Sequence, residues 1–238
     1  MIDVSTAQFL VNTISFFFAY CFVVSIGGGF RAWVASYLGD YTAEDEGYLT
    51  LSPMVHVSPI GLVFLVLRSF GVGHYIPVDP NRVHGRFRPL RLFLLYYSDT
   101  LLHILCACIG LMILIATFSP LMIHIVESMV INRNISHLYM VYYYPEYSSI
   151  AITMGFMLAA LVTLHIGLVV IEFLFNSLMI LFYVYLQSQQ LSMQDTAIYE
   201  LLAWLLIVLF FFTPLIGLVT SLISWVGYTA CMLLHIIQ

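Results

Sequence analysis

Residues 8–38 read QFLVNTISFFFAYCFVVSIGGGFRAWVASYL, and Arg31 is the only charged residue among them. A helix that crosses the hydrocarbon core of a bilayer needs about 20 mainly apolar residues. The segment is long enough and apolar enough, so it predicts a transmembrane helix. No basic residue precedes it, as one would in a signal peptide, and we expect the helix to be retained.

The rest of the chain has the same character. Of its 238 residues, 62% are hydrophobic and 8% are charged. Charged residues make up about a quarter of a soluble domain, and disordered chains combine low hydrophobicity with high charge. The composition therefore excludes both classes. It predicts an all-α polytopic membrane protein that forms a single domain over residues 1–238.

Four further apolar blocks predict the other membrane segments. They lie at residues 58–70, 89–118, 150–186 and 201–237. The first is too short for a full crossing, and we expect a short or re-entrant segment there. Pro214 predicts a break in the last block. The polar stretches between the blocks predict loops with short strands. The four cysteines lie in apolar runs, which favours buried thiols over a disulfide framework.

Charges and tyrosines outside these blocks indicate on which side of the membrane a loop lies and which side chains could contact a partner. Four of the seven arginines lie between Arg82 and Arg91, which predicts that this loop is cytoplasmic. So few basic groups do not indicate a nucleic-acid partner. A small acidic loop is interpreted as a solvated connection, and a tyrosine run fits an interfacial aromatic belt. Both are candidate partner contacts: Asp40, Glu44, Asp45 and Glu46, and Tyr142, Tyr143 and Tyr144.

Polar side chains inside two of the blocks predict a network within the membrane. Asp99 and His103 are four residues apart and share one helix face, as do His165, Glu172 and Asn176 in the later block. Ionisable groups at this depth are costly and usually have a role. We favour a hydrogen-bonded clasp between the two helices. The alternatives are a proton or ion path, a contact with a partner subunit, or haem ligation by His103 and His165.

Short motifs follow one another at nearly constant spacing from residue 32 to residue 78. They are AWVA at 32–35, LGD at 38–40, TA at 42–43, Gly47, LTL at 49–51, Pro53, His56, PIG at 59–61, FG at 70–71 and IPV at 76–78. The series resembles the compact bacterial group of the site-2 protease family, which are intramembrane zinc metalloproteases. The resemblance covers about residues 20–100, and LFN at 174–176 resembles a later family motif. It implies a site-2-protease-like helix core in a bacterial inner membrane.

The chain departs from this family where the family's chemistry lies. The family carries H-E-x-x-H just before AWVA, with two histidines on zinc and a glutamate that polarises the bound water. Here those positions are Gly27, Arg31 and Gly28, and the aspartate that completes the zinc site corresponds to Val184. Glycine and valine have no ligand atom, and arginine stays protonated. No other histidine pair has helical ligand spacing, so we expect no catalytic residue, metal or cofactor.

Arg31 and the three glycines before it each have two interpretations. Arg31 could place a fixed positive charge where the family holds zinc. We favour instead a side chain that extends from the helix end to the membrane interface. The glycines at 27–29 could allow close helix packing, or they could break the helix.

The expected function follows from the loss of the zinc site, because function resides in sites rather than folds. We expect a non-catalytic site-2-protease-like pseudoprotease that acts as a structural, assembly or accessory subunit of a larger membrane complex. Its partners would be other integral membrane proteins and lipids. The alternative is a haem- or quinone-binding, or a proton- or ion-conducting, membrane subunit.

Overall fold

The computed structural model describes residues 4–68, 71–132 and 137–188, together with isolated residues between 221 and 232. Among these residues there is no strand, and one antiparallel bridge joins Val57 to Gly73. The helices are α1 (Val4–Tyr37), α2 (Thr42–Asp45), α3 (Pro53–His56), α4 (Pro59–Arg68), α5 (Arg88–Thr117), α6 (Met122–Asn132), α7 (His137–Tyr143) and α8 (Ser149–Ser188).

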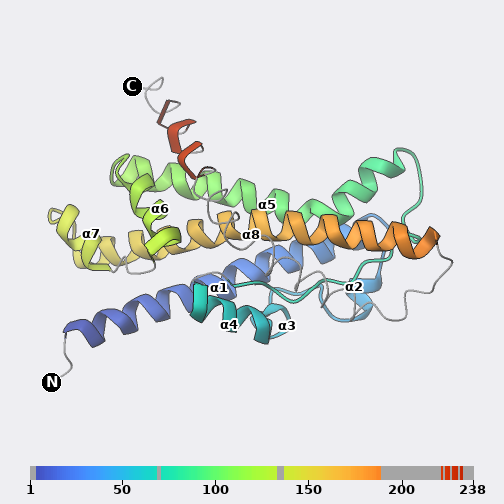
Figure 1. The fold of residues 1–238 in the computed structure, drawn as a ribbon, viewed down its shortest axis with the longest axis horizontal. Coiled ribbons are helices and arrows are strands. Elements are labelled where there is room, and N and C mark those ends of the chain that lie inside the picture. The colour runs from blue at the N-terminus through green and yellow to red at the C-terminus, as the bar shows by residue number, and fades with distance from the viewer. Residues whose placement is uncertain are drawn as a thin grey trace.

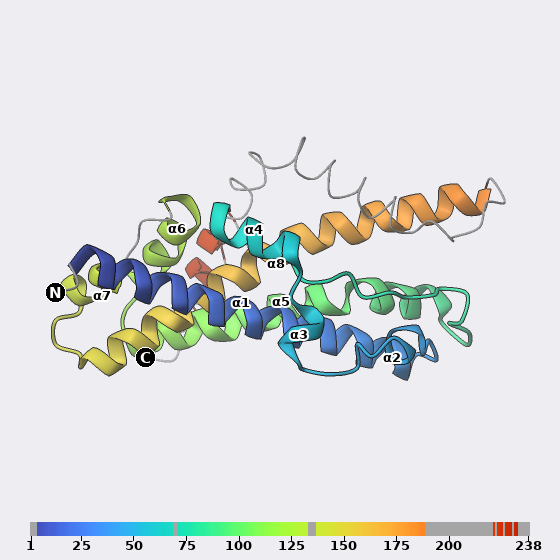
Figure 2. The same ribbon diagram turned by 90° about the horizontal axis from the view of Figure 1, so that it is seen from below.

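The three longest helices, α1, α5 and α8, contact one another and run along the long axis of the molecule (Figures 1 and 2). Helix α5 is antiparallel to the other two. Helix α8 also contacts α6 and α7, and every residue from 162 to 171 in it is buried. A helix that is apolar on all sides belongs in the interior. Helix α8 is therefore the centre of the fold.

Three helical segments are long enough and apolar enough to cross a membrane. They are Phe9–Tyr37, Arg88–Thr117 and Ser149–Tyr185. The outer faces of α1 and α5 expose large apolar side chains, including Phe9, Phe17, Phe18, Phe22, Leu105, Ile109 and Ile113. Such faces are stable against lipid tails, which are as apolar as leucine. The prediction of an all-α membrane protein is confirmed.

The observed helices settle two points that the sequence left open. Helix α1 is continuous through Gly27, Gly28 and Gly29, so these glycines do not break it. Helix α4 has 10 residues, about 15 Å of helix. A bilayer core is about 30 Å thick, so α4 is too short to cross it. The predicted segment at 201–237, with its break at Pro214, lies outside the described residues except for isolated positions.

The acidic loop and the arginine-rich loop lie at the same end of the long helices (Figure 1). Arg82 Nη1 is 3.6 Å from Asp45 Oδ2, and Arg91 Nη2 donates to the Leu38 carbonyl at 3.0 Å. Since α4 does not cross the membrane, both loops are on the same side of it. The cytoplasmic assignment of that side stays a prediction from the arginines.

Tyr20 fastens the extended segment 71–77 to α1 and α4. Its fully buried hydroxyl donates to the Val72 carbonyl at 2.8 Å and accepts from the Ser58 amide at 3.2 Å. Ser58 Oγ donates to the same carbonyl at 3.1 Å. Gly61 permits this approach, because a β-carbon there would collide with the Val72 carbonyl. The segment is thereby held against the three-helix core, which positions Tyr75.

Replacing Tyr20→Phe is expected to lower the free energy of unfolding by about 1–3 kcal/mol, because the buried Ser58 amide loses its acceptor. Denaturant unfolding of the detergent-solubilised protein measures the change. The matched control is Tyr37→Phe on the same helix, where the side chain is 79% exposed, and its effect should stay within about 0.5 kcal/mol. Equal effects of the two substitutions would contradict this account.

Candidate functional site

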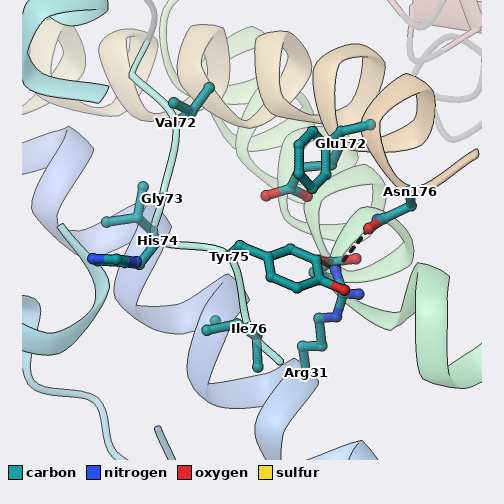
Figure 3. A pocket seen from close by; sticks show the side chains of 12 residues that line it. Arg31, Val72, Gly73, His74, Tyr75, Ile76, Glu172 and Asn176 are labelled. Atoms are coloured by element: carbon teal, nitrogen blue, oxygen red, sulfur yellow. Dashed lines mark hydrogen bonds and ion pairs between the residues drawn. The ribbon is translucent and has the colours of Figure 1, made fainter. Parts of the chain in front are cut away.

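Arg31 of α1 lies at the junction of the three long helices. Its side chain is 3% exposed, and Nη1 donates to Asp99 Oδ2 of α5 at 2.9 Å and to Asn176 Oδ1 of α8 at 2.8 Å. The Tyr75 ring from segment 71–77 lies over the guanidinium, with 5.4 Å between its centroid and the Arg31 Cζ atom (Figure 3). One cation thus joins three helices.

The favoured sequence interpretation of Arg31, a side chain extending to the membrane interface, is wrong. The guanidinium stays inside because Asp99 and Asn176 supply acceptors there. A buried charge is tolerated only when it is paired and hydrogen-bonded. Asp99 Oδ1 in turn accepts from the Thr100 amide at 2.7 Å, so both carboxylate oxygens are engaged.

A row of three titratable side chains continues from this ion pair between α5 and α8. His103 Nε2 lies 3.3 Å from Glu172 Oε2, and His103 Nδ1 lies 2.8 Å from His165 Nδ1. Both histidines are buried. The structure therefore brings together all five residues of the network proposed from the sequence. The two imidazoles touch directly, so a porphyrin could not lie between them, and this arrangement does not fit bis-histidine haem ligation.

The glycines of α1 allow two other imidazoles to pack against the helix. A β-carbon at Gly27 would lie 2.6 Å from His103 Cε1, and one at Gly28 would collide with His56 Nδ1. His56 Nε2 donates to the Thr50 carbonyl at 2.7 Å. Burial lowers the pKa of His56, because the charged ring is disfavoured away from water. Histidines from elsewhere in the chain thus fill the face of α1 at Gly27 and Gly28, the positions that correspond to the zinc motif.

The residues at the positions of the family's zinc site do not fit a zinc ion. A catalytic zinc site needs three side-chain ligands in a tetrahedral arrangement. Gly27 offers none, Arg31 is a cation, and Gly28 has no side chain that could polarise a bound water. Val184 is 55% exposed and lies eight residues beyond Asn176, about 12 Å along α8, so it is not part of the cluster. No group of three or more His, Cys, Asp or Glu side chains could hold a metal ion among the described residues.

A cavity of about 40 Å³ opens beside the cluster, lined in part by Arg31, Tyr75, Asp99, Glu172 and Asn176. Three donors beside the cavity, Arg31 Nε, Arg31 Nη2 and Asn176 Nδ2, are buried without a hydrogen-bond partner among the described residues, and so are His103 Nε2 and Glu172 Oε2. A polar cavity of this volume holds one or a few water molecules. Water is therefore the simplest partner for these donors.

Two residues predicted as partner contacts are buried instead. Asp40 is 0% exposed, and it accepts from the Thr42 amide at 3.1 Å and the Asp79 amide at 2.6 Å, so it ties two loops together. The Tyr144 hydroxyl lies 2.7 Å from Ser119 Oγ, and burial raises its pKa. The expectation that these two side chains contact a partner is wrong. The others are exposed: Glu44, Asp45, Glu46, Tyr142 and Tyr143.

Sequence reasoning did not place Tyr75 or His56 in the site, and it named Arg31 without pairing it with Asp99. The sequence did indicate that Arg31 pairs with Asp99, because Arg31 is the single charge in the first block and Asp99 is the single acid in residues 89–118. Opposite charges inside a membrane are expected to pair. Neither Tyr75 nor His56 had such a signal, since loop residues have no periodicity that assigns them to a face.

The Arg31–Asp99 pair is expected to behave as a unit in unfolding measurements. Arg31→Met or Asp99→Leu alone should lower the free energy of unfolding by about 3–5 kcal/mol, because each leaves a buried charge unpaired. The double variant should regain most of that loss. A double-mutant cycle in one detergent measures the coupling, and simple additivity of the two single losses would contradict the pairing.

No protein-family profile matches the chain, and no solved structure matches it. A segment of 49 residues is 41% identical to "Putative zinc metalloprotease YwhC" of Bacillus subtilis (strain 168). The match covers 21% of this chain and 22% of that protein, so it spans about a fifth of the relative's length. It relates a fifth of the chain to a protein named as a putative zinc metalloprotease, which supports at most a site-2-protease-like relationship.

Proposed function

We propose that the chain is a non-catalytic membrane protein with a site-2-protease-like core, and that it acts as an accessory or assembly subunit of a larger integral membrane complex. The bacterial inner membrane is its proposed location. The observation that supports this proposal is the Arg31 guanidinium, which is paired with Asp99 and Asn176 at a position that matches a zinc ligand of the protease family.

The chemistry of the cluster supports a structural role. A guanidinium donates hydrogen bonds and keeps its proton, so it cannot serve as a base. Placed between three helices, it fixes their relative positions through charge-assisted hydrogen bonds. An internal ion pair can therefore hold together a core that a metal would otherwise organise, without supplying the metal's Lewis acidity.

The crowding around α1 makes a return to metal binding difficult. The imidazoles of His103 and His56 occupy the space that side chains at Gly27 and Gly28 would need. New ligands there would have to displace two packed rings. The chain differs from a protease that has lost a single ligand, and this supports a role based on binding rather than hydrolysis.

The surfaces available for partners lie at opposite ends of the helix core (Figure 1). Glu44, Asp45 and Glu46 are exposed at one end, and Tyr142 and Tyr143 of α7 are exposed at the other. Lipid would cover the apolar faces between them. Both ends thus offer polar or amphipathic side chains to a membrane partner, near the two interfaces.

Zinc binding tests the loss of the metal site. We expect the purified protein to contain well below one zinc per chain by mass spectrometry of the metal, even after growth with added zinc. The triple variant Gly27→His, Gly28→Glu, Arg31→His should also fail to gain stoichiometric zinc, since His103 and His56 fill the space. One tightly bound zinc per wild-type chain would contradict the proposal.

Complex formation requires a separate test. The tagged protein, purified from its native membrane in mild detergent, should co-purify with integral membrane proteins in fixed stoichiometry, identified by mass spectrometry. Two variants locate the contact by loss of co-purification. One carries Tyr142→Ala and Tyr143→Ala, and the other has Glu44, Asp45 and Glu46 neutralised. Recovery of the wild-type chain alone, under conditions that preserve known complexes of that membrane, would refute the assembly role.

A further inference from the structure

Glu172, His103 and His165 lie in a row inside the molecule: the two histidines are hydrogen-bonded, and His103 is within ion-pair distance of Glu172 without a formed hydrogen bond. The two Nδ1 atoms of the histidines are 2.8 Å apart, and the other ring nitrogen of His103 is 3.3 Å from Glu172 Oε2. A neutral imidazole has one donor nitrogen and one acceptor nitrogen. The short Nδ1–Nδ1 contact therefore requires that one ring donates a hydrogen to the other, which couples the protonation states of the two rings.

Counting charges shows that the cluster needs one more proton. Arg31 and Asp99 cancel each other as an ion pair. An ionised Glu172 beside two neutral imidazoles would leave one net negative charge between the helices, and a net buried charge is unfavourable. A single proton removes it in either of two ways: on Glu172 as a carboxylic acid, or on the histidine pair as an imidazolium facing the carboxylate.

We propose that Glu172, His103 and His165 are a proton-binding site, which holds one exchangeable proton taken from water in the cavity beside Arg31. The two protonated forms interconvert by moving that proton between His103 Nε2 and Glu172 Oε2, with no other bond changed. A simple helix clasp would need no exchange with water. The site is independent of whether the chain assembles with partners.

The cavity gives this proton a route in. Glu172 lines the cavity and its side chain is 21% exposed, whereas that of His103 is 0% exposed. Glu172 is thus the member of the row that borders the cavity, and His165 is the far end of the row. Water held by Arg31 Nη2 and Asn176 Nδ2, which have no partner in the described part of the chain, would stand beside the carboxylate.

Among the residues that the structure describes, few other ionisable groups surround the row. The cluster receives Arg31 from α1, Asp99 from α5 and Tyr75 from segment 71–77, and the buried Tyr96 of α5 interacts electrostatically with Arg31 and Tyr75. His74 of that segment is exposed, and in Figure 3 its ring points away from Arg31 and Glu172. The charge of the site is therefore set by Arg31, Asp99 and the three residues of the row.

Nitrogen-15 NMR of histidine-labelled protein in lipid nanodiscs tests the proposal. In the wild type, the His103 and His165 signals should change together as the pH is varied, with one proton bound or released per chain. Glu172→Gln should abolish that shared transition. The matched control is Glu127→Gln, which removes the acid of the surface His124–Glu127 pair, 3.2 Å apart, and should alter the His124 signal alone.

Persistence of the shared transition in Glu172→Gln would overturn the proposal, as would ring signals that never change while the wild type stays folded. If Glu172→Gln does not fold, two measurements on the wild type test the proposal instead. Scalar coupling across the hydrogen bond between the two Nδ1 atoms, together with an infrared band of Glu172 that changes between acid and carboxylate over the same transition, is expected. Absence of either signal would overturn the proposal.

Discussion

One guanidinium determines how the helices of this protein meet. Arg31 extends from α1 to Asp99 on α5 and Asn176 on α8, in surroundings where an unpaired charge would cost several kcal/mol. Its acceptors must therefore lie at one level of the three helices. The small residues before Arg31 allow this, because Gly27 accepts the His103 ring against the backbone of α1. The row from His103 to Glu172 and His165 depends on the same helix register.

The site combines two features that would be in conflict in a zinc enzyme. A fixed cation occupies the position that matches a metal ligand, and imidazoles crowd the helix face beside it without converging on a common point. The match to a protein named as a putative zinc metalloprotease covers a fifth of the chain. On the proposed function, the helical core was retained while its centre changed from a metal site to an ion pair and a protonatable row.

The sequence predicted the long helices closely. An uninterrupted apolar run inside a membrane forms a helix because its backbone hydrogen bonds must be made within the segment. It also grouped Asp99 with His103, and His165 with Glu172, since helical spacing assigns residues to a face. It could not reveal that Arg31 joins these faces, because register between helices depends on packing that no single helix encodes. The burial of Asp40 could not be predicted either, because it arises from contact between two loops that are far apart in the sequence. Counting along the chain matched Val184 to the third zinc ligand, but in the continuous helix α8 this residue lies about 12 Å beyond Asn176.

The most direct test of the central claim is diffraction from crystals grown with excess zinc and recorded at the zinc absorption edge. The account predicts continuous side-chain density from Arg31 to Asp99 and Asn176, and no anomalous peak within ligand distance of His103, His165 or Glu172. An anomalous peak held by those side chains, with Arg31 turned out toward the membrane interface, would contradict it.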